Sequence, residues 1–149
     1  MPPEQRSRPR GLQEVVRSAI AEAGVESAVI FSSLPGSAAL ELAAAAGIEG
    51  PALDGLAAAV GSPGHPISRT FRDGTAAYNV EPTAPGGPAL RSHVPLVARD
   101  DDRQTVKGVL AVAHQHSLDA DARRALDRLA DTAAALVGRR SHQGADDSG

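Results

Sequence analysis

The sequence predicts an α+β fold built around a hairpin of two strands between residues 90 and 116. Two apolar runs, LRSHVPLVA and VKGVLAVAHQH, flank the charged connection RDDDRQT, which is the pattern of a β-hairpin with a solvated loop. The second run is apolar at both parities from Val106 to Ala113, so we expect a strand covered on both faces, at the centre of its sheet. Helical periodicity lies near both ends of the chain, and we expect the other elements to pack on this hairpin.

The composition is that of one globular domain. The chain has 149 residues, 42% of them hydrophobic and 22% charged, which is enough for a single core. Its only aromatic residues are Phe31, Phe71 and Tyr78, and its net charge is −3. The chain therefore offers no platform for stacking bases and no general attraction to phosphate backbones, so we expect no nucleic-acid partner.

Several site classes and compartments are excluded by composition. The chain has no cysteine, which rules out disulfides, thiolate metal sites and thiol nucleophiles. No apolar run approaches the ~20 residues that a membrane-spanning helix needs, and the N-terminal MPPEQRSRPR has no hydrophobic segment behind its arginines. We expect a cytoplasmic protein with no membrane partner. Lys107 is the only lysine beside many arginines, alanines, glycines and prolines, which is typical of a GC-rich bacterial genome.

The first elements are a tail, a helix and a strand. Residues 1–10 carry three prolines and three arginines without apolar periodicity, and we expect a disordered tail. Apolar residues recur at spacings of three and four over Gly11–Ala23, which predicts a helix ending before Gly24. Val25–Phe31 is short, apolar and β-branched, and is predicted to be a strand. Residues 32–37, with Pro35-Gly36 among them, are predicted to be a turn.

The segment Ala38–Ala46 allows two interpretations. Its sequence ALELAAAA has a high helix propensity. A tight turn after a strand favours a hairpin instead, and Leu40 and Leu42 alternate around Glu41. We interpret it as a strand that ends at Gly47.

The middle of the chain is helical and rich in loops. Ala52–Val60 is predicted to be a short helix, Gly61–Pro66 breaks it, and Ile67–Arg72 is predicted to form one more helical turn. Thr75–Val80 is a short β-prone run, and the proline-rich and glycine-rich Glu81–Pro88 must be a loop.

A long helix follows the hairpin. Apolar residues keep the helical period over Leu118–Val137, and Asp119 and Asp121 lie in the first turn, where the helix dipole favours negative charge. Gly138 is predicted to stop the helix, and residues 139–149 to form a disordered tail. The single domain is therefore expected to span residues 11–138.

This order of elements resembles a GAF domain. The likeness rests on VESAVIF, LELAAAAGIEG, GHPISRTFRDGTAAYNV and VPLVARDDDRQTVKGVLAVAH, followed by a helix containing LDRLADTAAALV, and it covers about residues 11–138. The resemblance implies an antiparallel sheet of five to six strands. The N- and C-terminal helices would lie on one face, and short helices and loops would cover the other face and often enclose a small-molecule pocket.

The resemblance also implies a sensory or regulatory role. Members of that family bind cyclic nucleotides, bilins, haem, amino acids or other metabolites. The cysteine of the bilin-binding members and the reactive cysteines of the free methionine sulfoxide reductases are absent here, and the signature of the cyclic-nucleotide-binding members is not visible. We therefore expect a non-catalytic module that binds a small-molecule metabolite. It would act through a separate signalling protein or through its own assembly, with no cofactor identified.

The middle segment and the first hairpin strand supply the candidate site. Polar and aromatic groups in a loop-rich region suit the wall of a ligand pocket, although they could equally satisfy the loop backbone and one another. On a pocket-facing strand an arginine can clamp a carboxylate or phosphate, or pair with a nearby acid instead. The candidate residues are His65, Ser68, Arg69, Phe71, Tyr78, Asn79, Arg91 and His93.

No metal site and no catalytic set is expected. His114 and His116 would share one strand face and, with His93, could ligate zinc, but no fourth ligand is evident, and we favour two strand-end histidines near solvent. Residues 100–102 are three aspartates interpreted as solvated turn residues rather than a calcium loop. Ser32 and Ser33 lack the G-x-S-x-G elbow, so the sequence predicts no enzyme.

The two terminal helices offer an interaction surface. Ala130, Ala133 and Ala134 are small enough to let a second helix approach, and the resemblance implies a homodimer through these helices. The alternative is that the apolar stripes simply cover the sheet. An interaction or dimerisation module with no bound ligand is the second functional hypothesis.

Overall fold

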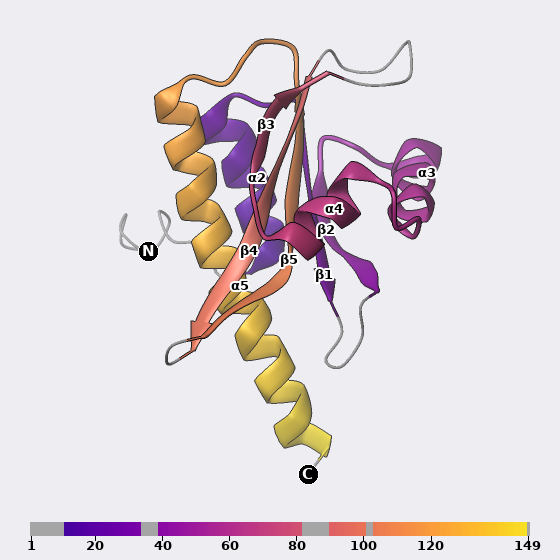
Figure 1. Cartoon of the computed structure of the whole chain (residues 1–149), viewed down its shortest axis with the longest axis vertical. Coiled ribbons are helices and arrows are strands. Elements are labelled where there is room, and N and C mark those ends of the chain that lie inside the picture. The colour runs from indigo at the N-terminus through magenta and orange to yellow at the C-terminus, as the bar shows by residue number, and fades with distance from the viewer. Residues whose placement is uncertain (1–10, 34–38, 82–89, 101–102, 149) are drawn as a thin grey trace.

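One antiparallel sheet lies between two layers of helices (Figure 1). The computed structural model describes residues 11–33, 39–81, 90–100 and 103–148. The strands run in the spatial order β2-β1-β5-β4-β3, so the α+β class and the five-stranded sheet are confirmed. The elements in chain order are α2 (Leu12–Ala23), β1 (Ser27–Ser33), β2 (Leu40–Ala46), α3 (Gly50–Val60), α4 (Pro66–Asp73), β3 (Ala77–Val80), β4 (Leu90–Asp100), β5 (Arg103–His114) and α5 (Ala120–Ser148).

The prediction that the second hairpin strand is central is confirmed. β5 is the middle strand, paired antiparallel with β1 on one side and with β4 on the other. Leu110 and Val112 point into the core on one face of the sheet, and Val109 and Ala111 into the core on the other. Because consecutive side chains of a strand alternate between faces, a run that is apolar at both parities needs cover on both sides.

The N- and C-terminal helices form the layer on one face. α2 and α5 lie together on the same side of the sheet in Figure 1, and their apolar stripes join the larger core. Val15 and Val16 of α2 and Leu126 of α5 are fully buried there. α2 ends at Gly24, which adopts a left-handed conformation (φ 71°), as its position after the last periodic residue predicts.

The short middle helices form the layer on the opposite face. α3 and α4 lie on the far side of the sheet from α2 and α5 (Figure 1). Val60 of α3 and Ile67 of α4 pack with Phe31 and Val109 of the sheet in a second, smaller core. α4 ends at Gly74, again with positive φ (68°). This thinner layer is the one that leaves room for a cavity.

The interpretation of the segment as a strand is confirmed over Leu40–Ala46, and the predicted turn before it begins too early. β2 pairs with β1 and ends before Gly47, whose φ is 78°. Ser32 and Ser33, predicted to lie in the turn, belong to β1, since Ser32 pairs with Glu41 on one side and Gly108 on the other. These ladder bonds outweigh the turn preference of serine. The predicted Pro35-Gly36 turn lies outside the described residues.

The charged connection of the hairpin is shorter than predicted. Residues 99–105 were expected to form a loop, but β4 continues to Asp100 and β5 begins at Arg103, with Arg99 opposite Gln104. Polar residues at the exposed end of a hairpin can continue the ladder because their side chains stay in water. Residues 101 and 102, and all of the predicted loop Glu81–Pro88 except Glu81, lie outside the described residues.

The last helix is longer than predicted. Gly138 was expected to stop it and residues 139–149 to be disordered, but α5 continues to Ser148, past the end of the sheet (Figure 1). Each of the two glycines in this part of the helix, Gly138 and Gly144, costs only about 1 kcal/mol relative to alanine, and the arginines, glutamine and alanine around them are good helix formers. The predicted tail at residues 1–10 lies outside the described residues. Among the helices that the structure describes, none is long and apolar enough to cross a membrane.

Gly108 allows the two central strands to approach closely. A Cβ built on it would lie 2.1 Å from the Phe31 carbonyl oxygen. We therefore expect Gly108→Ala to lower the free energy of unfolding by about 2 kcal/mol, because backbone atoms must move apart. Urea denaturation monitored by circular dichroism measures this loss.

The matched control is Gly55→Ala in α3. A Cβ at Gly55 meets nothing within 4 Å, and alanine in a helix interior is about 0.5–1 kcal/mol more favourable than glycine. Equal stabilities for the two variants would contradict the close approach at Gly108.

Candidate ligand-binding site

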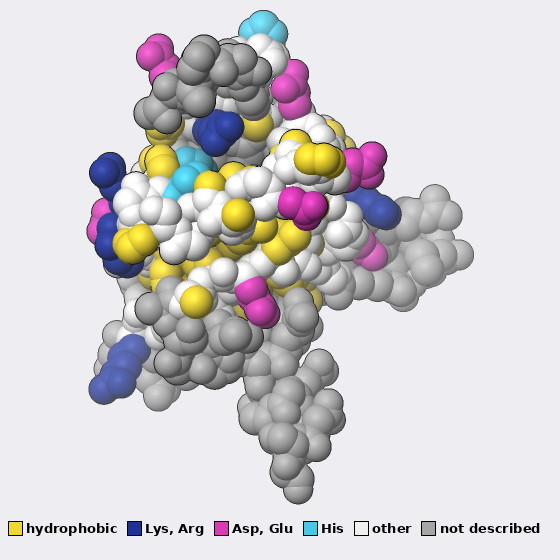
Figure 2. All heavy atoms as spheres, turned by 90° about the vertical axis from the view of Figure 1, so that its right-hand side faces the viewer, with side chains coloured by type: hydrophobic (Ala, Val, Ile, Leu, Met, Phe, Trp, Pro, Cys, Tyr) yellow, Lys and Arg dark blue, Asp and Glu magenta, His cyan; other side chains and the backbone are white. Residues whose placement is uncertain are grey.

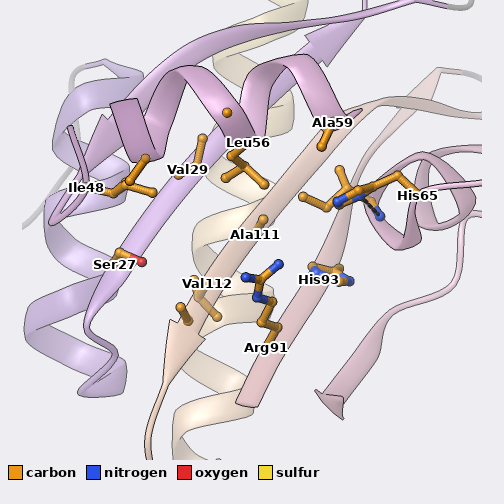
Figure 3. Close-up of a pocket in the computed structure, with 14 residues that line it drawn as sticks. Ser27, Val29, Ile48, Leu56, Ala59, His65, Arg91, His93, Ala111 and Val112 are labelled. Carbon is orange, nitrogen blue, oxygen red and sulfur yellow. Dashed lines mark hydrogen bonds between the residues drawn. The ribbon is translucent and has the colours of Figure 1, made fainter. Parts of the chain in front are cut away.

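A cavity lies between the sheet and the layer of α3 and α4. Its volume is about 360 Å³, at the lower end of the range of small-molecule sites. The strands β1, β4 and β5 form its floor, while α3, α4 and Ile48 form its walls (Figure 3). The lining residues are Ser27, Val29, Ile48, Ala52, Gly55, Leu56, Ala59, His65, Ile67, Arg91, His93, Ala111, Val112 and Ala113.

Most of this lining is apolar. Val29, Leu56 and Ile67 come from three different elements and meet around the cavity. Figure 2 looks onto this side of the molecule and shows hydrophobic side chains gathered beside a histidine. An apolar cavity with a few polar groups is the usual composition of a small-molecule site.

β4 places Arg91 and His93 in the cavity. They are two residues apart and therefore share a face, on which Arg91 lies opposite Ala113 and His93 opposite Ala111 of β5. In Figure 3 the guanidinium of Arg91 points up into the cavity beside His93. The predicted position of both residues on one face of the first hairpin strand is confirmed.

α4 places His65 at the same end of the cavity. His65 is the residue before the helix, and its Nδ1 accepts a hydrogen bond from the backbone N–H of Ile67 at 3.1 Å. This capping bond satisfies one of the donors that a helix N-terminus leaves free. In the neutral ring the proton must therefore be on Nε2, which can still donate.

His93 is the most confined of these groups. Only 3% of its surface is exposed, and its Nδ1 has no hydrogen-bond partner among the described residues. Burial, assisted by His65 and Arg91, lowers the pKa of His93 to about 4. Burial and the charge of Arg91 also lower the pKa of His65. Both rings are therefore neutral at pH 7 beside a permanently charged guanidinium.

The structure does not bring the other α4 candidates into the cavity. The Ser68 hydroxyl donates to the Val60 carbonyl oxygen at 2.7 Å and ties α4 to the end of α3. Phe71 packs against the smaller core. Arg69 is exposed and does not line the cavity. The sequence grouped these residues by proximity along the chain, while the helix turns them away from one another.

Tyr78 and Asn79 lie on the opposite side of the sheet. The Tyr78 hydroxyl donates to the Asp127 carboxylate of α5, and the Arg123 guanidinium lies 4.9 Å from its ring centre. Asn79, with φ of 56°, accepts a hydrogen bond from the Leu118 N–H at 2.8 Å through its Oδ1. Both residues tie β3 to the α5 layer, away from the cavity.

The predicted arrangement of His114 and His116 is wrong. β5 ends at His114, so the two residues do not share a strand face. His114 is 2% exposed, not near solvent, and its ring bonds to Ser92 Oγ at 2.9 Å and the His116 carbonyl oxygen at 2.7 Å. His114 faces the α5 layer and His93 faces the cavity. No group of three potential metal ligands occurs among the residues that the structure describes.

The pair Ser92 and His114 has the separation of a nucleophile and its base but not the surroundings. Ser92 is fully buried and its Oγ already accepts from the Asn79 N–H at 3.0 Å. The Nδ1 of His114 bonds a carbonyl oxygen rather than the carboxylate of a catalytic triad. The pair is therefore a structural link inside the core.

Several of the residues that line the cavity were not identified from the sequence. Ser27 and Val29 share a face of β1, and Ala111 shares the corresponding face of β5. The alternation along each strand was readable, and it would have separated these side chains from those pointing at α2 and α5. The contribution of Ile48 and Leu56 depends on where α3 lies, for which no signal was available.

Comparisons with known proteins give likenesses of structure alone. No family model matches the sequence, and no curated protein matches it. The second GAF domain of DevS from Mycobacterium smegmatis superimposes with a TM-score of 0.64 at 22% identity, covering 88% of this chain and 93% of that one. The GAF domain of a phosphoenolpyruvate-protein phosphotransferase (ptsP) from Coxiella burnetii gives 0.70 at 12% identity, covering 95% and 91%.

One similar structure is an enzyme. The type II free methionine-R-sulfoxide reductase from Thermoplasma acidophilum superimposes with a TM-score of 0.64 at 14% identity, over 86% of this chain and 90% of that one. Its activity is a property of that protein. The fold is thus shared by proteins with different roles, so the role of this chain must be argued from its own cavity.

The lowered pKa of His93 predicts a pH-dependent stability. The pKa of His93 is near 6.5 in the unfolded chain and about 4 in the folded one. The unfolded chain therefore takes up the proton first as the pH falls, so the free energy of unfolding is highest above pH 6.5 and decreases as the pH falls towards 4. Between pH 7 and pH 5 we expect the free energy of unfolding to fall by about 2 kcal/mol more in the wild type than in His93→Gln. Urea denaturation at the two pH values measures the difference.

His116→Gln is the control for this titration, because His116 is exposed. It should retain the full pH dependence of the wild type. A His93→Gln protein with an unchanged pH dependence would show that His93 does not carry the effect.

Proposed function

We propose that this chain, which has the GAF fold, is a non-catalytic sensory or regulatory module that binds a small molecule in the cavity beneath α3 and α4. The observation that supports this most directly is the cavity itself, about 360 Å³ in volume and lined mainly by apolar side chains. A fully packed interior would leave few voids larger than a water molecule. An apolar space of this size, with a few polar groups in its lining, suits an organic ligand.

The position of the cavity also supports binding. Its floor consists of the central strands β1, β4 and β5, whose backbone is held by the sheet. Its walls are short helices, which contribute fewer buried residues to the core than α2 and α5 do. A ligand would therefore rest on a rigid surface beneath a cover that is held by fewer contacts.

The chemistry of the cavity supports binding rather than turnover. No carboxylate from the described part of the chain lines it, so a histidine there has no acid to orient it, and the chain has no cysteine to act as a nucleophile. The module would instead report occupancy to another chain. The similar structures from Mycobacterium smegmatis and Coxiella burnetii are each described as a GAF domain of a named protein.

The partner would be a separate signalling protein or a second copy of this chain. Ala130, Ala133 and Ala134 do not support the dimer as expected, because all three are buried within this chain against the sheet and α2. The outward side of these helices is polar and includes the ion pair of Glu22 with Arg128. A homodimer through α2 and α5 would therefore use polar contacts.

Native mass spectrometry of the purified protein tests ligand binding. We expect an extra non-covalent mass that leaves on denaturation. Ala111→Leu places a larger side chain on the cavity floor and should abolish the extra mass. Ala58→Leu is the matched control, since Ala58 is exposed on α3 and does not line the cavity.

A bare protein in every preparation, including protein incubated with a small-metabolite extract, would contradict ligand binding. That outcome would favour the second function, an interaction module without a ligand.

Sedimentation equilibrium tests self-association. We expect a dimer at high protein concentration, weakened by salt because the outward faces of α2 and α5 are charged. A monomer at the highest concentration attainable would contradict the homodimer and leave the separate signalling protein as the partner.

A further inference from the structure

Among the described residues that line the cavity, the one permanently charged group is a cation. The lining includes the hydroxyl of Ser27, the rings of His65 and His93 and the guanidinium of Arg91, and no aspartate or glutamate among the residues that the structure describes. The rest of the lining is alanine, glycine and branched aliphatic residues. The cavity therefore has one basic end and one apolar end.

Arg91 is a charged group without a counter-ion within the described ranges. Its guanidinium makes no ion pair and no side-chain hydrogen bond with any residue in the described ranges, although it is partly buried in the cavity. Arginine remains protonated in proteins and presents a planar fork that matches a carboxylate. A cation held at the edge of an apolar cavity is stabilised when an anion occupies that position.

His93 supplies a second unsatisfied group at the same place. Its Nδ1 is buried and without a partner among the described residues, and it lies two residues along the same strand face from Arg91. The fold is able to satisfy a buried histidine, because His114 on the opposite face has partners for both of its ring nitrogens. The unpaired nitrogen of His93 belongs to a residue that lines the cavity, where a ligand atom could pair with it.

His65 extends this basic end from the opposite wall. Since its Nδ1 is used in capping α4, its Nε2–H is the donor that remains. Arg91, His93 and His65 would then offer donors from two elements to one acceptor group (Figure 3).

We propose that the ligand is a small carboxylic acid in its ionised form with an apolar body. The carboxylate would pair with the Arg91 guanidinium and accept from His93, and the apolar body would lie against Val29, Leu56 and Ile67. This inference rests on the proposed ligand-binding function. One permanent cation beside two neutral rings matches a single negative charge, which favours a carboxylate over a doubly charged phosphate ester.

Matched pairs of acid and amide test the charge. The probes are 3-phenylpropionate with 3-phenylpropionamide and 4-methylpentanoate with 4-methylpentanamide, titrated at pH 7 by calorimetry. Because charge-assisted hydrogen bonds are stronger than neutral ones, we expect each acid to bind the wild type roughly 10- to 100-fold more tightly than its amide.

The variants locate the charge recognition. Arg91→Gln should reduce the acid-to-amide ratio to about 1, and His93→Gln should reduce it in part. Arg69→Gln, an exposed arginine outside the cavity, should leave the ratio unchanged. Circular dichroism checks that each variant is folded. If Arg91→Gln does not fold, Arg91→Lys replaces it. Lysine keeps the charge but loses the planar fork, so the acid-to-amide ratio of Arg91→Lys should fall between that of the wild type and 1.

The outcomes separate this inference from the function on which it rests. Amides that bind as tightly as acids, but not to Ala111→Leu, would overturn the carboxylate assignment and leave the cavity as a binding site. Phenyl phosphate binding more tightly than both acids would overturn it in favour of a phosphate ester. If neither member of a pair binds, the carboxylate assignment is wrong, and a bare native mass spectrum would overturn the binding function as well.

Discussion

The architecture depends on covering both faces of β5. Leu110 and Val112 on one face and Val109 and Ala111 on the other are all apolar, and leaving either side in water would expose a row of them. Two separate helical layers follow from that requirement. The heavier layer of α2 and α5 buries the larger cluster, while α3 and α4 cover less of the sheet, and the cavity lies beneath this lighter cover.

Most of the fold could be predicted from local patterns. The two parities of Val106–Ala113 indicated the central strand, and the spacing of apolar residues indicated α2 and α5. Errors arose where a residue type was taken as a boundary. Gly138 was taken as a helix end, yet glycine does not stop a helix by itself; at Gly24 the backbone turns left-handed and α2 ends, while α5 continues through Gly138. Ser32 was assigned to a turn, but its two neighbouring strands keep it in the sheet.

The candidate site was predicted less well because its members come from distant segments. Arg91 and His93 could be placed together, since two positions on one strand share a face. Tyr78 was grouped with the candidates of the loop-rich middle segment, but it follows Ala77, which pairs with His93, so the alternation of the strand turns it to the α5 side. The sequence also left open a metal site that joins His93 to His114, although the sheet lies between them. A parity count on each strand separates such residues, while the position of α3 requires the tertiary structure.

Ser92 gives β4 a mechanical role beyond lining the cavity. It lies between Arg91 and His93 in the chain but points to the other face, where it bonds to His114 and to the backbone of Asn79. Asn79 in turn holds the N–H of Leu118, just ahead of α5. Arg91, Ser92 and His93 are consecutive residues of one strand, so a displacement of β4 along its axis would move the groups on its cavity face and those on its α5 face together. β4 thus connects the two layers: one face of the strand carries the basic groups of the cavity, and the other is hydrogen-bonded towards the start of the longest helix.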